Sequence, residues 1–118
     1  MCNYIKTLSK GKSGELSLCC QCRVYHLEFN NIYLEFDEKE FEKFKTFILE
    51  IEMDYWEYKY ASARMIRKIP IPSIQQNLVL MFNRQEIIEL KSLFLNISND
   101  VFLTFLDTKD IDYTLILN

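Results

Sequence analysis

Residues 31–48 combine two hydrophobic periods in succession. Ile32, Leu34 and Phe36 alternate with polar or amphipathic neighbours, which is typical of a strand with one buried face. The apolar residues then recur every three or four positions, the spacing of an amphipathic helix. That stripe consists of Phe41, Phe44, Phe47, Ile48 and Ile51. The pattern predicts a strand followed by a helix from about Glu38 to Met53.

The same pattern returns 46 residues later, in residues 77–94. Leu78, Leu80 and Phe82 alternate as in a strand, and a second helical stripe follows. It consists of Ile87, Leu90, Leu93, Phe94 and Ile97. Each copy has a helix-start signal between strand and helix. The pairs are Asp37 with Glu40 and Asn83 with Glu86, and both fit a capping box.

A further strand, Val24–Phe29, precedes the first copy and leads through Asn30-Asn31 into Ile32. Asn tolerates a positive φ, so a two-residue hairpin turn fits here. This turn would pair Phe29 with Ile32, Leu27 with Leu34 and Tyr25 with Phe36. It would also set His26 opposite Glu35, on the other face.

The remaining segments are less regular. Residues 1–14 resemble a flexible polar approach to a first strand at Glu15–Cys20. A strand is expected over Arg64–Ile71, ended by Pro70 and Pro72, which cannot donate in a ladder. Another is expected at about 112–117. Residues 99–111 fit neither helix nor strand decisively.

These elements predict an α+β fold in one domain, residues 1–118. Pseudo-twofold duplicated β-β-α units would form an antiparallel sheet with two helices on one face. The first half spans about residues 15–53, the second about 64–98, and a C-terminal strand about 112–117 closes the sheet. The alternative is a dimer that swaps the two halves.

Composition excludes several classes of protein. The chain has 118 residues, 49% of them apolar, and a net charge of −3 with mixed signs, so no basic stripe suits nucleic acid. It has no apolar run long enough for a membrane span and no signal peptide. We therefore expect a cytoplasmic protein whose four cysteines are reduced or metal-bound.

One group of residues suggests metal chemistry. Cys19-x-x-Cys22 brings two sulfurs to one ion, and a tetrahedral zinc site needs about four such ligands. Cys2, Cys19, Cys22 and His26 would supply them, with Cys20 as a substitute. The motif lacks the glycine usual in such a knuckle, and a second Cys-x-x-Cys is absent. Zinc, if bound, would be structural.

Two alternatives remain for these residues. Cys20 and Cys22 could be core residues beside Leu16 and Leu18, with His26 in a surface pair. Cys19 and Cys22 could instead form a redox couple. Such a couple normally begins a helix, whose dipole lowers the pKa of the thiol, whereas strands flank this motif.

Other residues suggest contact surfaces. Val79 and Met81 stand at outward positions of the second copy and predict a protein interface, possible in a homodimer, or else a face covered by the C-terminal segment. An aromatic cluster could stack a ligand or close over the helix end as core. It consists of Tyr55, Trp56, Tyr58 and Tyr60. The acidic residues near it, including Glu50 and Glu52, fit a solvated helix face.

Several short motifs also carry a resemblance. They are Gly14-Glu-Leu, Cys19-x-x-Cys22, Tyr25-His-Leu-x-Phe-x-Asn-Ile32 and Glu40-Phe-x-x-Phe44. With these motifs the chain resembles a small uncharacterised family of Bacteroidetes proteins, a domain of unknown function, over about residues 2–95. The resemblance implies a bacterial cytoplasmic protein and no particular reaction.

The function that the sequence favours is a non-enzymatic interaction module, with a homodimer or another protein as partner and a zinc knuckle as a structural part. The alternative is a thiol-redox or metal-dependent enzyme using Cys19, Cys22 and His26. Neither nucleic acid nor a membrane is an expected partner.

Overall fold

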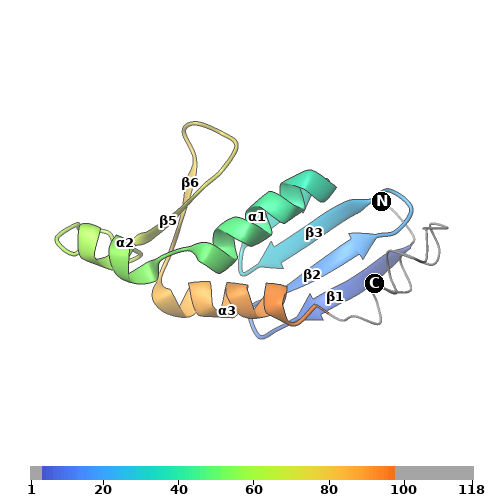
Figure 1. Cartoon of the computed structure of the whole chain (residues 1–118), viewed down its shortest axis with the longest axis horizontal. Helices are drawn as coiled ribbons and strands as arrows, with labels where there is room; N and C mark the ends of the chain where they lie inside the picture. Colours follow the sequence, from blue (N-terminus) through green and yellow to red (C-terminus); the bar gives the residue numbers. More distant parts are fainter. Residues whose placement is uncertain (1–3, 98–118) are drawn as a thin grey trace.

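The computed structural model describes residues 4–97, which fold into an antiparallel sheet, a separate hairpin and three helices (Figure 1). In chain order the elements are β1 (Ile5–Lys10), β2 (Gly14–Cys19), β3 (Val24–Phe29), β4 (Ile32–Phe36), α1 (Glu38–Glu50), α2 (Met53–Lys59), β5 (Ile69–Pro72), β6 (Val79–Phe82) and α3 (Arg84–Leu95). The predicted α+β class is confirmed.

The larger sheet is a simple meander in the order β1-β2-β3-β4, with every pair antiparallel. Its first strand falls in the segment that the sequence analysis took for a flexible approach, and that expectation is wrong. In β1 only Leu8 and Ser9 are buried, and a bulge shifts the register between Thr7 and Ser9. The alternation is therefore too short and irregular to be recognised in the sequence.

The β3–β4 hairpin has the predicted register. Tyr25 pairs with Phe36, Leu27 with Leu34 and Phe29 with Ile32. At the turn, Asn30 adopts a φ of 53°, the left-handed conformation that Asn tolerates. Turn chemistry and hydrophobic alternation favour the same register, which explains why this part of the prediction is correct.

Both long helices cover one face of the meander, as predicted (Figure 1). Helix α1 lies against β3 and β4, and α3 lies against β1 and β2. The rings of Phe41 in α1 and Phe94 in α3 approach to 5.6 Å, and Phe41 stacks on Tyr25 of the sheet at 4.0 Å. The core between the layers includes Leu16, Leu27, Phe29, Ile48, Ile87 and Leu90.

Both helices begin at the predicted capping boxes. The Asp37 carboxylate accepts from the backbone N–H of Glu40 at 2.8 Å, and the Glu40 side chain accepts from the N–H of Asp37 at 2.9 Å. Asn83 and Glu86 exchange the same two bonds at 2.8 and 2.9 Å. Each box satisfies two amides that the first helical turn would otherwise leave without a partner.

The prediction that both halves share one sheet is wrong. Strands β5 and β6 pair only with each other among the described residues, as a two-stranded hairpin that projects from the body (Figure 1). Ile69, Ile71 and Phe82 on its inner face are buried and join the main core. A two-stranded hairpin is only marginally stable by itself. Packing of this inner face on the main core stabilises it without edge pairing to the meander.

The prolines lie within β5 instead of ending it. Ser73 N–H donates to Leu78 O, so alternation along the ladder makes Ile71–Leu80 and Ile69–Phe82 the other hydrogen-bonded pairs. The nitrogens of Pro70 and Pro72 then face away from β6. Proline is tolerated at such an edge because no N–H is needed there.

The first helix is shorter than predicted. Helix α1 ends at Glu50, and Ile51 is extended with φ −67° and ψ 133°. Ile51 is buried, so packing of its side chain overrides continuation of the helix. The aromatic cluster then forms a separate helix, α2. The predicted strand at about 112–117 and the unassigned segment 99–111 lie outside the described residues.

Candidate functional site

The cysteine motif forms the turn between β2 and β3. Cys19 ends β2 and is 1% exposed, and Cys22 is exposed in the turn. The backbone N–H of Cys22 donates to Cys19 Sγ at 3.2 Å, and the N–H of Arg23 donates to Cys19 O at 2.8 Å. Arg23 has a φ of 59°, so it adopts the conformation that the missing glycine would supply. The backbone is therefore shaped as a knuckle around the Cys19 sulfur.

The three described cysteines are in different states. Cys19 and Cys22 each take part in a disulfide, and Cys20 is a half-buried free thiol packed against the core. The disulfide form differs from the reduced or metal-bound state that the composition predicts. Disulfide and metal thiolate are alternative states of the same sulfurs, because a metal binds only deprotonated, reduced cysteine.

His26 lies on the face of the sheet away from the helices, as predicted. Its Nδ1 is 2.6 Å from the Tyr33 hydroxyl and 3.4 Å from Glu35 Oε2. The Tyr33 hydroxyl donates to Glu35 at 2.8 Å, so it accepts from His26 Nδ1, and Nε2 is left as the acceptor of the ring. The pKa of Tyr33 is raised, mainly by partial burial of the hydroxyl and to a lesser extent by its hydrogen bond to Glu35. The hydroxyl therefore stays protonated.

The predicted zinc ligands are only partly brought together. Cys2 lies outside the described residues. Within residues 4–97, no three His, Cys, Asp or Glu side chains gather as a metal site, so His26 does not complete one with Cys19 and Cys22. The sequence nevertheless located the turn and the direction of His26, from spacing and alternation alone.

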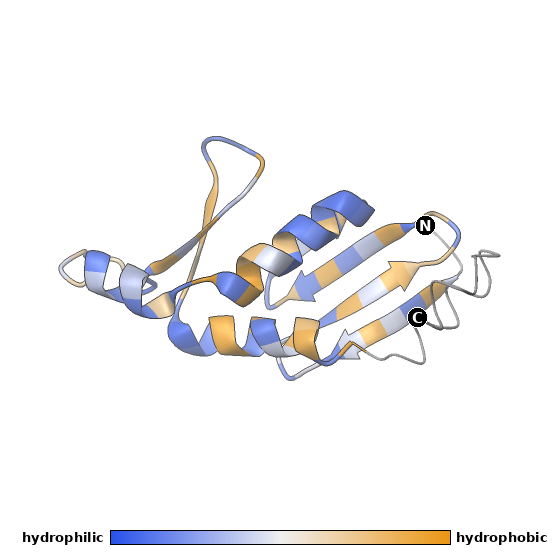
Figure 2. Ribbon diagram, in the orientation of Figure 1, coloured by the Kyte–Doolittle hydropathy of each residue, from blue (hydrophilic) through white to orange (hydrophobic). Residues whose placement is uncertain are grey.

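The predicted interface residues lie on the outer face of the β5–β6 hairpin. Val79 is opposite Pro72 and Met81 is opposite Pro70, away from the buried inner face. Val79 is 46% exposed, and Leu78 and Ile74 near the tip are also exposed. Figure 2 shows hydrophobic residues along this projecting hairpin.

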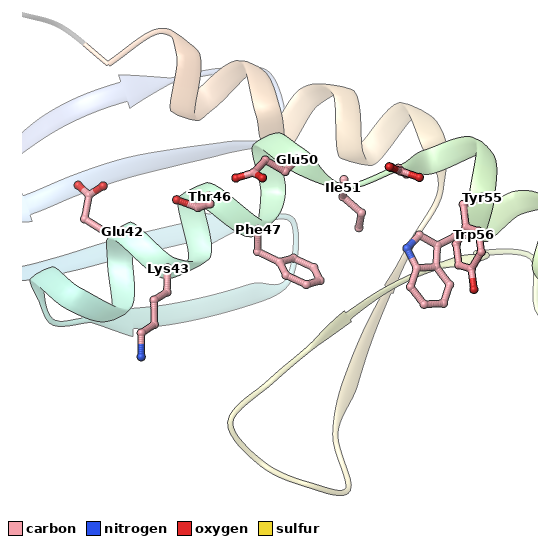
Figure 3. A pocket seen from close by; sticks show the side chains of 9 residues that line it. Glu42, Lys43, Thr46, Phe47, Glu50, Ile51, Tyr55 and Trp56 are labelled. Carbon is pink, nitrogen blue, oxygen red and sulfur yellow. The ribbon is translucent and has the colours of Figure 1, made fainter.

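A groove that the sequence analysis missed lies where α1 ends and α2 begins. Its volume is about 700 Å³, and Phe47, Ile51 and Trp56 form its apolar floor. Glu42, Glu50 and Glu52 stand around it. Figure 3 shows Phe47 and Trp56 directed towards one another, with Ile51 between them. The break in the helix creates this groove, and nothing in the local sequence signals that break.

The aromatic cluster of α2 is divided between surface and core. Tyr58 is 86% exposed and Tyr55 is 52% exposed, whereas Trp56 is partly buried and packs against the core. Trp56 and Tyr60 stack at 5.9 Å, and Lys59 Nζ lies 5.2 Å from the Trp56 centroid. The ammonium of Lys59 is therefore held over aromatic faces.

The acidic residues of α2 have a local partner. Arg84 at the start of α3 forms ion pairs with both Asp54 and Glu57. The hydrogen bond to Glu57 has the largest effect on the pKa of Arg84 and, with the bond to Asp54, raises it. These contacts join α2 to α3 at the surface. Asp54 and Glu57 are therefore paired with Arg84, whereas Glu50 and Glu52 lie beside the groove.

Fold and site together define a small α+β protein with a cysteine turn and a projecting hairpin. The chain belongs to a family of unknown function, DUF6686, which matches it over residues 1–118. No curated protein and no solved structure matches it. None of the helices within residues 4–97 has the length and apolar character needed to cross a bilayer.

Proposed function

We propose that this protein is a non-enzymatic interaction module that associates through the projecting β5–β6 hairpin. One observation carries the proposal: β6 is an apolar strand, exposed at Val79 and half-buried at Met81, whose outer edge pairs with no other strand in the described part of the chain. An edge of this kind is a template for pairing with another chain.

The two edges of the hairpin differ. Pro70 and Pro72 place no N–H on the outer edge of β5, so that edge cannot form a regular ladder. The outer edge of β6 carries the N–H and C=O groups of Val79 and Met81, because Leu78, Leu80 and Phe82 are directed to β5 by the register. Of the two edges of the hairpin, only that of β6 is therefore suited to strand addition.

A second copy of the chain fits this edge. Two β6 strands can pair antiparallel about a twofold axis at Leu80, which sets Val79 of each copy opposite Met81 of the other. Val79–Phe82 contains no charged residue, so this pairing brings no like charges together. The four outward Val79 and Met81 side chains would form one apolar surface.

Light scattering coupled to gel filtration tests the dimer. We expect the unmodified protein to run as a dimer at micromolar concentration, and Val79→Lys and Met81→Lys to run as monomers. Ile88→Lys is the matched control, since Ile88 on α3 is also 46% exposed. A monomer at every concentration, or a dimer that Met81→Lys leaves unchanged, would overturn the proposal.

We further propose that the β2–β3 turn holds a structural zinc ion when its thiols are reduced. The N–H of Cys22 directed at Cys19 Sγ, and the left-handed Arg23, suit thiolate ligands in a knuckle. Cys2 is the proposed third ligand, and a solvent molecule would take the fourth position.

Metal analysis tests the zinc site. Protein purified in reductant without chelator is expected to contain one zinc per chain and to lose it on Cys22→Ser. Cys20→Ser is the control, because Cys20 is a free thiol on the core side of the turn. Metal-free reduced protein would contradict the site.

A second candidate function is a thiol-redox factor, favoured by the Cys-x-x-Cys spacing of Cys19 and Cys22 and by the presence of both sulfurs in disulfides. This function requires an activated thiolate, and the turn joins two strands and does not itself begin a helix. Iodoacetamide alkylation of reduced protein across pH separates the two candidates. A thiol that reacts at full rate well below pH 7 would favour the redox function.

The setting and the origin of the module are separate proposals. Reduced thiols in the knuckle would need a reducing compartment, so we propose a cytoplasmic protein. The resemblance of its motifs to a family of Bacteroidetes proteins favours an origin in that phylum. The shared strand, capping box and helix at β4–α1 and β6–α3 support a duplicated origin for these two units.

A further inference from the structure

We infer that the groove between α1 and α2 binds a lysine or arginine side chain from an apolar segment of a partner protein. The inference rests on the proposed role as an interaction module, but it concerns a different surface from the hairpin edge. It identifies the chemistry of the segment that the module would receive.

The floor of the groove suits an apolar segment. Phe47 is 39% exposed, although its ring lies on the helical stripe that the sequence analysis expected to be buried. Trp56 is half-buried and faces it across Ile51 (Figure 3). A volume of about 700 Å³ accommodates several side chains, and its apolar floor would gain from burial.

The rim of the groove is acidic and lacks local compensation. Glu42, Glu50 and Glu52 are exposed, and none of them forms an ion pair within residues 4–97. Lys43 is the only basic side chain among the described residues that line the groove. By contrast, Asp54 and Glu57 on α2 are both paired with Arg84. The surplus of negative charge therefore remains at the groove.

The end of α1 increases this preference for a cation. The C-terminus of a helix carries partial negative charge, which basic side chains in the last turn usually offset. The last turn of α1 contains no basic residue and instead carries Glu50, with Glu52 two positions further on. This arrangement opposes the helix dipole, and a bound cation would relieve it.

The aromatic residues already attract an ammonium group within the chain. Lys59 Nζ lies 5.2 Å from the ring centroid of Trp56 and 5.8 Å from that of Tyr55. A cation over an aromatic face is attracted by the ring, and carboxylates nearby add a separate Coulomb attraction. The groove combines both features, which favours lysine or arginine over a neutral side chain.

Fluorescence of Trp56, the single tryptophan of the chain, provides a direct test. The probe is a blocked pentapeptide with lysine between two leucines, and its control has glutamate in place of lysine. We expect a saturable change in emission with the lysine peptide alone, weakened by salt. The Glu50→Gln, Glu52→Gln double variant should bind about tenfold more weakly, whereas Glu28→Gln on the opposite face of the sheet should not.

Misfolding does not account for the expected loss of affinity. Removing negative charge from the end of α1 relieves an unfavourable contact with the dipole, so the double variant should melt no lower than the unmodified protein. Equal binding of both peptides, or unchanged affinity in the double variant, would overturn the inference. So would equally tight binding of blocked lysine alone, since that would assign the groove to a small cation.

The two proposals fail separately. Met81→Lys is expected to abolish the dimer and to leave the peptide titration intact, because Met81 does not line the groove. A monomeric protein that still binds the lysine peptide would reject only the hairpin dimer. A dimer with no peptide response would reject only the groove.

Discussion

The ring of Phe29 in β3 meets the ring of Phe82 in β6 edge-on, with centroids 5.9 Å apart and planes inclined at 71°. Both side chains are almost fully buried. This contact anchors the base of the projecting hairpin to the meander. Edge-to-face aromatic pairs contribute beyond the area that they bury.

We expect Phe82→Ala to lower the free energy of unfolding by about 3–5 kcal/mol, because the buried ring leaves a cavity between the two sheets. Urea denaturation followed by circular dichroism measures the loss. Leu95→Ala is the control, since Leu95 is 69% exposed and should change stability little. A loss below about 1 kcal/mol for Phe82→Ala would show that the hairpin does not depend on this contact.

The two glycines beside the β1–β2 turn should respond differently to alanine. A Cβ at Gly14 would lie 2.2 Å from the backbone oxygen of Glu28, so β2 and β3 would have to separate. A Cβ at Gly11 would meet only the Leu93 side chain, at 3.4 Å. We expect Gly14→Ala to destabilise by at least about 1–3 kcal/mol and Gly11→Ala to be nearly neutral. Thermal melting of both variants compares them, and equal melting temperatures would contradict the close approach at Gly14.

The capping boxes should contribute independently to stability. Asp37→Ala and Asn83→Ala each remove the acceptor for one first-turn amide, and each should cost about 1 kcal/mol. Ser in place of either residue should retain most of the stability, because its hydroxyl can accept the same bond. The two helices begin at opposite ends of the helical layer (Figure 1), so the double variant should lose the sum of both single losses. A double loss well below that sum would show that the two caps are coupled.

Acidification should weaken the ion pair between Arg67, which precedes β5, and Glu86 of α3. Arg67 donates to Glu86 at 2.8 and 3.0 Å, and this contact, partly opposed by burial, lowers the pKa of Glu86. Because the pKa of Glu86 is lower in the folded than in the unfolded protein, the ionised carboxylate stabilises the fold. This stabilisation is complete above the unfolded pKa, about 4.3, and is lost as pH falls through the folded pKa. Arg67→Gln should therefore be less stable than the unmodified protein at pH 6, and the difference should shrink below about pH 4. Urea midpoints measured at both pH values test this, and a difference that grows on acidification would contradict it.

Several features of the site were accessible to sequence reasoning. Alternation located His26 opposite Glu35, and the Cys-x-x-Cys spacing located the turn that the backbone closes around Cys19. The outward direction of Val79 and Met81 also followed from period two. The groove was not accessible, because it depends on the conformation of Ile51 and on the packing that buries this side chain.

By itself, the sequence determined the local units of this protein. Hairpin register, capping boxes and amphipathic stripes depend on residues close to one another in sequence. Their interactions form whatever the tertiary arrangement is. Tertiary structure alone decided which strands share a sheet. Strand β1 joined the meander despite a weak pattern, and β5–β6 remained apart despite a strong one, because edge pairing depends on how much apolar surface each strand can bury against the rest of the chain.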